Sequence, residues 1–254
     1  MTDWESVSII VWPTLAIIAS LVIWQWLSTS ETVNPIILPS ATDTFSALAD
    51  QIQTSEFWQN TWVTTQETVI GFAGGVFAAW VLGTMIGLFR FFALTFYPII
   101  VAIEIVPRIA LVPVFLTWFG FGIASKIVIA GLICFFPVLI NVVLGTRGVD
   151  EDAKKLMHSF GASKWEAYKK LTLPSSLPAV FAGIRIAIVF ALTGAIVGEY
   201  VGGNEGLGVQ IKVDNFQLQI PEVFAAIIAL AILGLVMYWI VAAIESKVVF
   251  WRGH

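Results

Sequence analysis

Few side chains in this sequence could take part in chemistry, because 58% of its 254 residues are hydrophobic and only 12% are charged. Glu104 and Arg108 lie four residues apart in an apolar stretch, a spacing that places them on one face of a helix. Charges in such a stretch usually face a partner or a cavity. The two therefore either neutralise each other beside a helix break at Pro107, or line a pathway in which Arg108 attracts an anionic solute.

A second acid, Glu199, lies near the end of another apolar stretch and just before a glycine-rich segment. Two interpretations are open for it. Glu199 either lines the exit of a pathway or contacts an external protein there, or it is an ordinary glutamate at a membrane interface.

The sequence contains no arrangement of residues typical of a catalytic centre. No Ser/His/Asp or Cys/His combination supports nucleophilic catalysis, and His158 and His254 have no neighbouring metal ligands. The single cysteine, Cys134, cannot form an intrachain disulfide and is expected to pack in a core. The phosphate-binding pattern G-x-x-x-x-G-K-[ST] is also absent. We therefore predict a chain that is not an enzyme, with no catalytic residue, metal or cofactor of its own.

The elements that carry these charges are long apolar stretches. Several exceed the roughly 18 residues that a transmembrane helix needs. We predict an all-α polytopic membrane protein in which residues 1–254 form one transmembrane domain of about six spans. The predicted spans cover about Ile9–Leu27, Trp62–Phe89, Thr95–Phe119, Lys126–Gly145, Ala179–Val201 and Val223–Val249. The third is interrupted by Pro107 and Pro113, and six spans would place both termini on one side.

Three smaller patterns accompany the spans. A turn at Pro39 and Ser40 is expected to lead into a short amphipathic helix. The segment Gly198–Gly208 is expected to form a turn or a re-entrant piece outside the membrane. Small residues four apart allow helices to approach closely, although glycine is common in membrane helices in any case. Two such glycine pairs are Gly71 with Gly75 and Gly83 with Gly87.

Residues 147–178 form the only long polar segment and hold six of the 13 lysines and arginines. Cytoplasmic loops of membrane proteins carry an excess of positive charge, so this loop should face the cytoplasm, and with it both termini. The charges thus indicate topology and not a nucleic-acid partner.

The loop itself reads as two helices separated by Gly161. Acidic residues from Asp150 onward suit a helix N-terminus, Gly161 suits a helix end, and Ser163 with Glu166 forms a capping-box pattern. Pro174 is expected to end the second helix, as is Pro178. Either the inner ends of the spans or another protein must cover the loop's apolar side chains, which are Leu156, Met157, Phe160 and Trp165.

The spacing in this loop resembles that of bacterial ABC importer permeases, whose consensus is E-A-A-x3-G-x9-I-x-L-P. Here Gly161 is followed by nine residues and then by Leu171-Thr172-Leu173-Pro174, while Lys155-Leu156-Met157 replaces the E-A-A tripeptide. Residues 37–48, 106–122, 135–145 and 206–208 also resemble the branch that carries sulfonate, taurine, nitrate and vitamin-precursor permeases.

The resemblance implies a type I importer fold with a cytoplasmic coupling helix that docks on a separate ATP-binding subunit. The residues it assigns to coupling are Phe160, Gly161, Ala162, Ser163, Lys164, Trp165, Leu171 and Pro174. It further implies a homodimer of the permease in the bacterial inner membrane, an ATPase dimer that binds ATP and Mg, and an extracytoplasmic solute-binding protein. The stretch from Pro107 to Pro113 is somewhat more similar to the vitamin-precursor permeases of pyrimidine or riboflavin type. The alternative is an ATP-independent secondary transporter or channel, which would show paired broken helices in two related halves.

Overall fold

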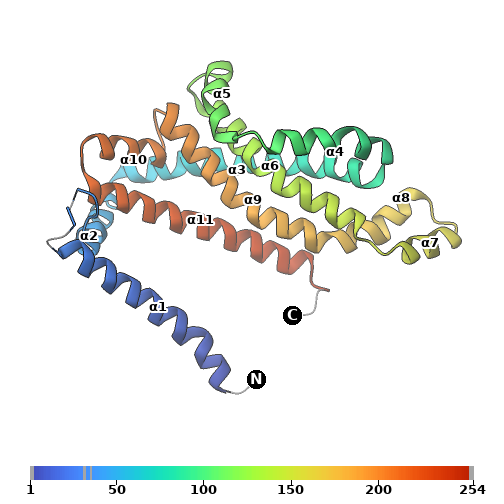
Figure 1. Ribbon diagram of the computed structural model, residues 1–254, viewed down its shortest axis with the longest axis horizontal. Helices are drawn as coiled ribbons and strands as arrows, with labels where there is room; N and C mark the ends of the chain where they lie inside the picture. Colours follow the sequence, from blue (N-terminus) through green and yellow to red (C-terminus); the bar gives the residue numbers. More distant parts are fainter. Residues whose placement is uncertain (1–2, 31–32, 35, 252–254) are drawn as a thin grey trace. The chain divides into compact units, whose positions relative to one another are not determined.

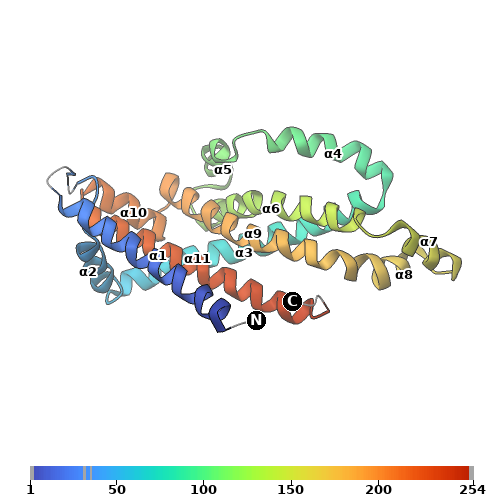
Figure 2. The ribbon, with the colours of Figure 1, turned by 60° about the horizontal axis from the view of Figure 1, so that its bottom comes forward.

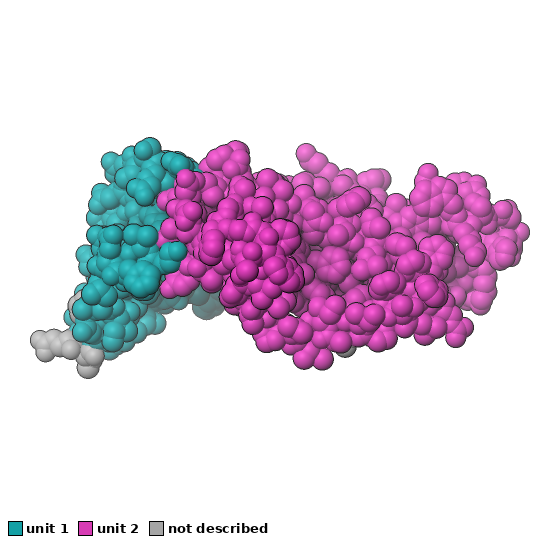
Figure 3. Space-filling model, turned by 90° about the horizontal axis from the view of Figure 1, so that it is seen from above, with its two compact units in different colours: residues 1–59, 210–230 teal, residues 60–209, 231–254 magenta. Residues whose placement is uncertain are grey.

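The computed structural model describes residues 3–30, 33, 34 and 36–251, and within these ranges the chain is helical and contains no β-strand. It divides into two compact units, coloured separately in Figure 3. One unit consists of residues 1–59 and 210–230, and the other consists of residues 60–209 and 231–254. Each is described below by itself.

The first unit contains α1 (Asp3–Thr29), α2 (Ala41–Gln51) and the first residues of α3 (Ser55–Leu88) and α11 (Ile220–Val248). Trp24 joins its parts: the indole Nε1 donates to the Pro39 carbonyl at 3.0 Å, and its ring lies 6.0 Å from that of Phe224. The Ser40 hydroxyl accepts from the Asp43 amide and caps α2. The predicted short helix after Ser40 is therefore confirmed.

The first unit also contains Asp214, on α10 (Leu207–Phe216). Its Oδ2 is buried without a hydrogen-bond partner among the described residues. Burial, and then the nearby negative charges of Glu222 and Glu56, raise the pKa of Asp214 to about 6. Helix α10 was not predicted, because a ten-residue segment with two charges resembles a loop.

Besides the two short helices of the basic loop, the second unit contains the remainder of α3, then α4 (Arg90–Glu104), α5 (Val112–Phe119), α6 (Ile123–Arg147), α9 (Leu173–Gly202) and the remainder of α11 (Figures 1 and 2). A 3₁₀ turn, Arg108–Leu111, precedes α5, and the chain bends by 88° between Arg90–Glu104 and Arg108–Phe119. In the described ranges, five helices are long and apolar enough to cross a membrane, or six if this bent pair is one span. The predicted fold class, an all-α polytopic membrane protein, is confirmed, and the chain is interrupted where the third span was expected.

All four glycines of the two predicted pairs lie where α3 packs on α6. A Cβ added to Gly75 would lie 2.5 Å from the Gly131 carbonyl oxygen, and one added to Gly87 would lie 2.6 Å from the Thr146 methyl. The other two meet α6 in the same way, and these are Gly71 and Gly83. Backbones this close leave no room for a side chain, so the glycine pairs do form a helix–helix contact.

The core of this unit lies between α3, α6 and α9, and both ribbon views show α6 and α9 running side by side. Its fully buried side chains include Ile86, Val138 and Ala191. Cys134 is also fully buried there, as expected for a packing residue. Ile188 of α9 packs on Met237 and Val241 of α11.

Candidate functional site

The basic loop begins with a well-capped helix, α7 (Glu151–Ser159). The Asp150 side chain accepts from the Asp152 amide at the N-terminus. At the other end Gly161 has a φ of +78°, its amide bonds to the His158 carbonyl, and the Ala162 amide bonds to the Met157 carbonyl. This pair of bonds is a Schellman motif, which ends a helix at a glycine in the left-handed conformation. The predicted break at Gly161 is confirmed.

The second helix of the loop, α8 (Lys164–Ala167), starts with the predicted capping box. The Ser163 hydroxyl accepts from the Glu166 amide, and the Glu166 carboxylate accepts from the Ser163 amide at 2.9 Å. The prediction that Pro174 and Pro178 end this helix was wrong. A π-helical turn, Tyr168–Thr172, connects α8 directly to α9, so both prolines lie inside one continuous helix. Proline lacks an amide donor, and the wider i→i+5 pattern of the π turn accommodates this.

The loop presents large apolar side chains that this chain does not cover. Phe160 is 79% exposed, Trp165 is 61% exposed and Leu156 is 57% exposed. Trp165 stacks on Tyr168 with ring centroids 5.4 Å apart, and the Lys169 ammonium lies 4.8 Å from the indole. The sequence left two possible covers for these side chains, the inner ends of the spans or another protein. The inner ends of the spans do not cover Phe160, Trp165 or Leu156.

The residues that the sequence assigned to coupling do not all share that surface. Gly161, Ser163 and Lys164 are exposed, and Ala162 is half-buried. Leu171 and Pro174 are half-buried too, one in the π turn and the other in the first turn of α9. The exposed surface therefore runs from Phe160 to Trp165, and the last two positions form the helix behind it.

Glu104 and Arg108 do pair across the bend between α4 and the 3₁₀ turn. The Arg108 Nη2 lies 3.4 Å from the Glu104 Oε1, with the side chains 19% and 40% exposed. The guanidinium also lies 4.5 Å from the centre of the Phe136 ring on α6. The pair thus neutralises its own charge while Glu104 stays open to the surroundings.

Glu199 lies in a buried polar cluster of the second unit. Its side chain has no exposed surface, and it accepts from the Thr64 hydroxyl at 2.6 Å and the Gly208 amide at 2.7 Å. Thr64 in turn accepts from the Leu207 amide at 3.0 Å, and Asn60 accepts from the Gly206 amide at 2.9 Å. Three consecutive amides of the glycine-rich segment are therefore bound to α3 and α9.

The glycines of this segment are required by the close approach. Gly206 has a φ of +111°, and a Cβ there would lie 2.3 Å from the Glu199 carboxylate. No side chain fits at that distance. The segment is thus a turn whose amides are bound by buried side chains of α3 and α9. The Glu199 side chain positions this turn and does not face outward.

Two further charged groups belong to this cluster, and the sequence analysis did not identify them. Glu67 and Lys126 are each 2% exposed. Glu67 lies beside Glu199, and the Lys126 Nζ donates to three carbonyl oxygens, those of Phe121, Gly122 and Gly202. A signal was present, because α3 carries polar residues on one helical face at Asn60, Thr64, Glu67 and Thr68.

On the opposite half of α9, Arg185 forms an ion pair with Glu245 of α11 and lies near the Tyr238 hydroxyl. This pair ties the two helices together. Within the described residues, no group of three His, Cys, Asp or Glu side chains could hold a metal ion. His254 lies outside them.

Comparison with known proteins identifies the family to which this chain belongs. The profile of the family described as binding-protein-dependent transport system inner membrane component matches residues 71–250. This chain is a member of that family. The match covers the glycine-rich α3–α6 contact, the basic loop and Glu199 itself, and it begins after the α3 residues that bond to the Glu199 cluster.

Individual relatives agree with the family assignment. The formylaminopyrimidine transport permease protein of Halalkalibacterium halodurans is 34% identical to the permease, over 94% of this chain and 95% of the relative. The riboflavin transport system permease protein of Chloroflexus aurantiacus is 31% identical, over 95% and 92%. The putative aliphatic sulfonates transport permease protein of Bacillus subtilis is 29% identical, over 92% and 84%.

The permease is thus a multi-pass membrane subunit of an ATP-driven importer, and ATP hydrolysis takes place in a separate subunit. The predicted resemblance to ABC importer permeases of this branch is confirmed. The family also implies an ATPase partner and a substrate-binding protein in general.

Proposed function

We propose that the permease carries a vitamin precursor of pyrimidine or riboflavin type into the cell. The observation that supports this is the pair of relatives named for formylaminopyrimidine and riboflavin, which are 34% and 31% identical over nearly the whole chain. A relative named for taurine is 26% identical. Sulfonate, taurine or nitrate are the other solutes that this branch of the family would accommodate.

The solute can be identified through the partner binding protein. We expect mass spectrometry of that protein, purified with its ligand, to find a pyrimidine or flavin compound. Uptake of the labelled compound into vesicles that contain the whole transporter should depend on ATP. A sulfonate, taurine or nitrate in the binding protein would contradict the proposal.

We propose further that the surface from Phe160 to Trp165 docks on the ATPase, with Leu171 and Pro174 as its support, and that the ATPase dimer holds the ATP and Mg. Support comes from the exposure of Phe160 and Trp165. Apolar side chains this large, surrounded by charge, are typical of a surface that a protein partner covers. Co-purification with the ATPase should require them, and an unchanged complex after Phe160→Ala with Trp165→Ala would contradict this docking.

In this proposal two copies of the permease form the membrane part, and both termini lie in the bacterial cytoplasm, which the positive charge of the basic loop supports. The Glu104–Arg108 pair at the 88° bend lines the pathway, since Glu104 remains 40% exposed. Glu199, with no exposed surface, acts by holding the glycine-rich turn. The test is Arg108→Gln, which should change uptake while the complex with the ATPase still forms.

A further inference from the structure

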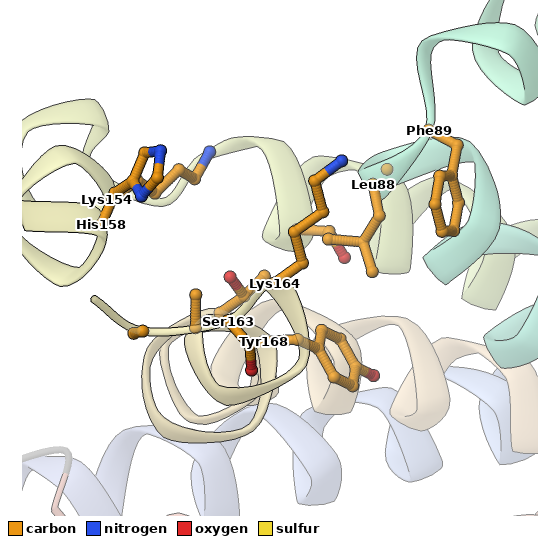
Figure 4. A pocket seen from close by; sticks show the side chains of 12 residues that line it. Leu88, Phe89, Lys154, His158, Ser163, Lys164 and Tyr168 are labelled. Atoms are coloured by element: carbon orange, nitrogen blue, oxygen red, sulfur yellow. The ribbon is translucent and has the colours of Figure 1, made fainter.

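A cavity of about 560 Å³ lies behind the basic loop, between the end of α3, the last turn of α6, α7 and α8. Figure 4 shows it from close by. Leu88 and Phe89 form one side, and Tyr168 lies beneath the long side chain of Lys164, which extends toward Leu88. All of these residues belong to the second unit.

The charges around the cavity have one sign. Three basic side chains line it, Lys154 and His158 from α7 and Lys164 from α8, and no carboxylate is among its lining residues. Of the nearby acids, Glu166 closes the capping box, whereas Glu151 pairs with Lys154 at 3.0 Å and offsets part of the charge of that one lysine. The cavity therefore suits an anion, and two lysines with a histidine can surround a phosphate group.

Beside hydroxyl side chains, the lining also has an apolar wall at the end of α3, formed by Leu88 and Phe89. Leu88 is 42% exposed and Phe89 is 49% exposed, at the end of a helix long enough to cross a bilayer. A free phosphate ion would gain nothing from this apolar wall, whereas the glycerol and acyl carbons of a lipid would. Basic pockets beside membrane helices on the cytoplasmic side are known as sites for anionic lipid headgroups.

From these observations we infer that the cavity binds an anionic phospholipid. Its phosphate lies between Lys154, His158 and Lys164, and its glycerol and first acyl carbons lie on Leu88, Phe89 and Tyr168. The choice of the cytoplasmic leaflet rests on the proposed orientation, whereas the binding itself does not. Because α8 forms one wall, a bound lipid would stabilise the loop in the position from which the docking surface projects.

The test compares lipids on the purified full-length permease by native mass spectrometry in micelles that contain phosphatidylglycerol and phosphatidylcholine. The wild type should retain phosphatidylglycerol in preference. Lys154→Gln with Lys164→Gln should lower that preference about 30-fold, since each basic residue contributes about 1 kcal/mol to an anionic headgroup. The charge-keeping pair Lys154→Arg with Lys164→Arg should retain it, which separates lost binding from misfolding.

A matched control uses Lys169→Gln with Lys170→Gln, which removes two charges of the same loop outside the cavity. It should change the preference less than about 3-fold. Three results would overturn the inference. One is an equal loss in the control pair. Another is binding of glycerol 3-phosphate as tight as that of the lipid. The last is a variant with Lys154→Gln and Lys164→Gln that keeps its lipid preference but no longer binds the ATPase. That result would mean that the cavity binds an acidic segment of the ATPase.

Discussion

Replacing Thr64 with valine keeps the shape of the side chain but removes a hydroxyl that serves both α3 and the glycine-rich turn. That hydroxyl donates to the Glu199 carboxylate at 2.6 Å and accepts from the Leu207 amide at 3.0 Å, and both Thr64 and Glu199 have no exposed surface. After the substitution the buried Leu207 amide lacks a partner, and the buried Glu199 carboxylate keeps the Gly208 amide but loses the donor on its Oε1. Each such group costs about 1–3 kcal/mol.

The expected loss of stability is about 2–3 kcal/mol, toward the lower end of the summed range. The reason is that helices unfolded within a bilayer or micelle recover some hydrogen-bond partners. For a chain of this length, 1 kcal/mol corresponds to about 2–4 °C in Tm. We therefore expect Thr64→Val to lower the Tm by about 5–10 °C.

The chain supplies its own reporter for this measurement. Cys134 is the only cysteine and is fully buried, so a thiol-reactive fluorescent dye labels it only when the helices separate. The matched control is Thr65→Val, because the Thr65 hydroxyl donates only to the Thr61 carbonyl of its own helix. Thr65→Val should shift the Tm by less than about 2 °C. Equal Tm values for the two variants would refute the role given to the Glu199 cluster.

Three further results are expected. Gly75→Leu should reduce the fraction that stays monodisperse after heating, whereas Gly74→Leu should not, because a Cβ at Gly74 meets nothing within 4 Å. Asp214 has a raised pKa of about 6, so the folded state binds its proton more tightly than the unfolded state does. The Tm should therefore fall as the pH rises from about 4 to about 6, and in the same pH series Asp214→Asn should abolish this dependence. Glu245→Gln should lower the Tm by leaving Arg185 without its ion-pair partner, and a Tm equal to that of the wild type would contradict that role.

The elements that depend on local patterns could be predicted from the sequence. Long apolar stretches, the capping box at Ser163 and the left-handed Gly161 each follow from residues adjacent in the chain. The glycine pairs on α3 were also informative. Small residues four apart allow two helix backbones to approach closely, but glycine is common in membrane helices, so the contact itself is shown by the structure.

What the sequence could not supply depends on contacts between distant residues. Glu67 and Lys126 are buried in one cluster although nearly 60 residues separate them, and no local pattern pairs them. The π turn before Pro174 was missed because proline usually ends a helix, and only the wider turn allows the helix to continue. The cavity behind the basic loop likewise appears only when α3 and α7 are brought together.

In the proposed function, the surface around Gly161 transmits ATP hydrolysis to the membrane helices. Its most direct test is the ATPase rate of the reconstituted transporter with its binding protein and solute, for Gly161→Asp and for Gly120→Asp. Both glycines have a φ of +78° and open space around them, so the backbone strain introduced is similar, but only Gly161 lies in the basic loop. We predict that Gly161→Asp inserts in the membrane yet loses solute-stimulated ATPase activity, whereas Gly120→Asp retains it. Full stimulation in Gly161→Asp would contradict the claim.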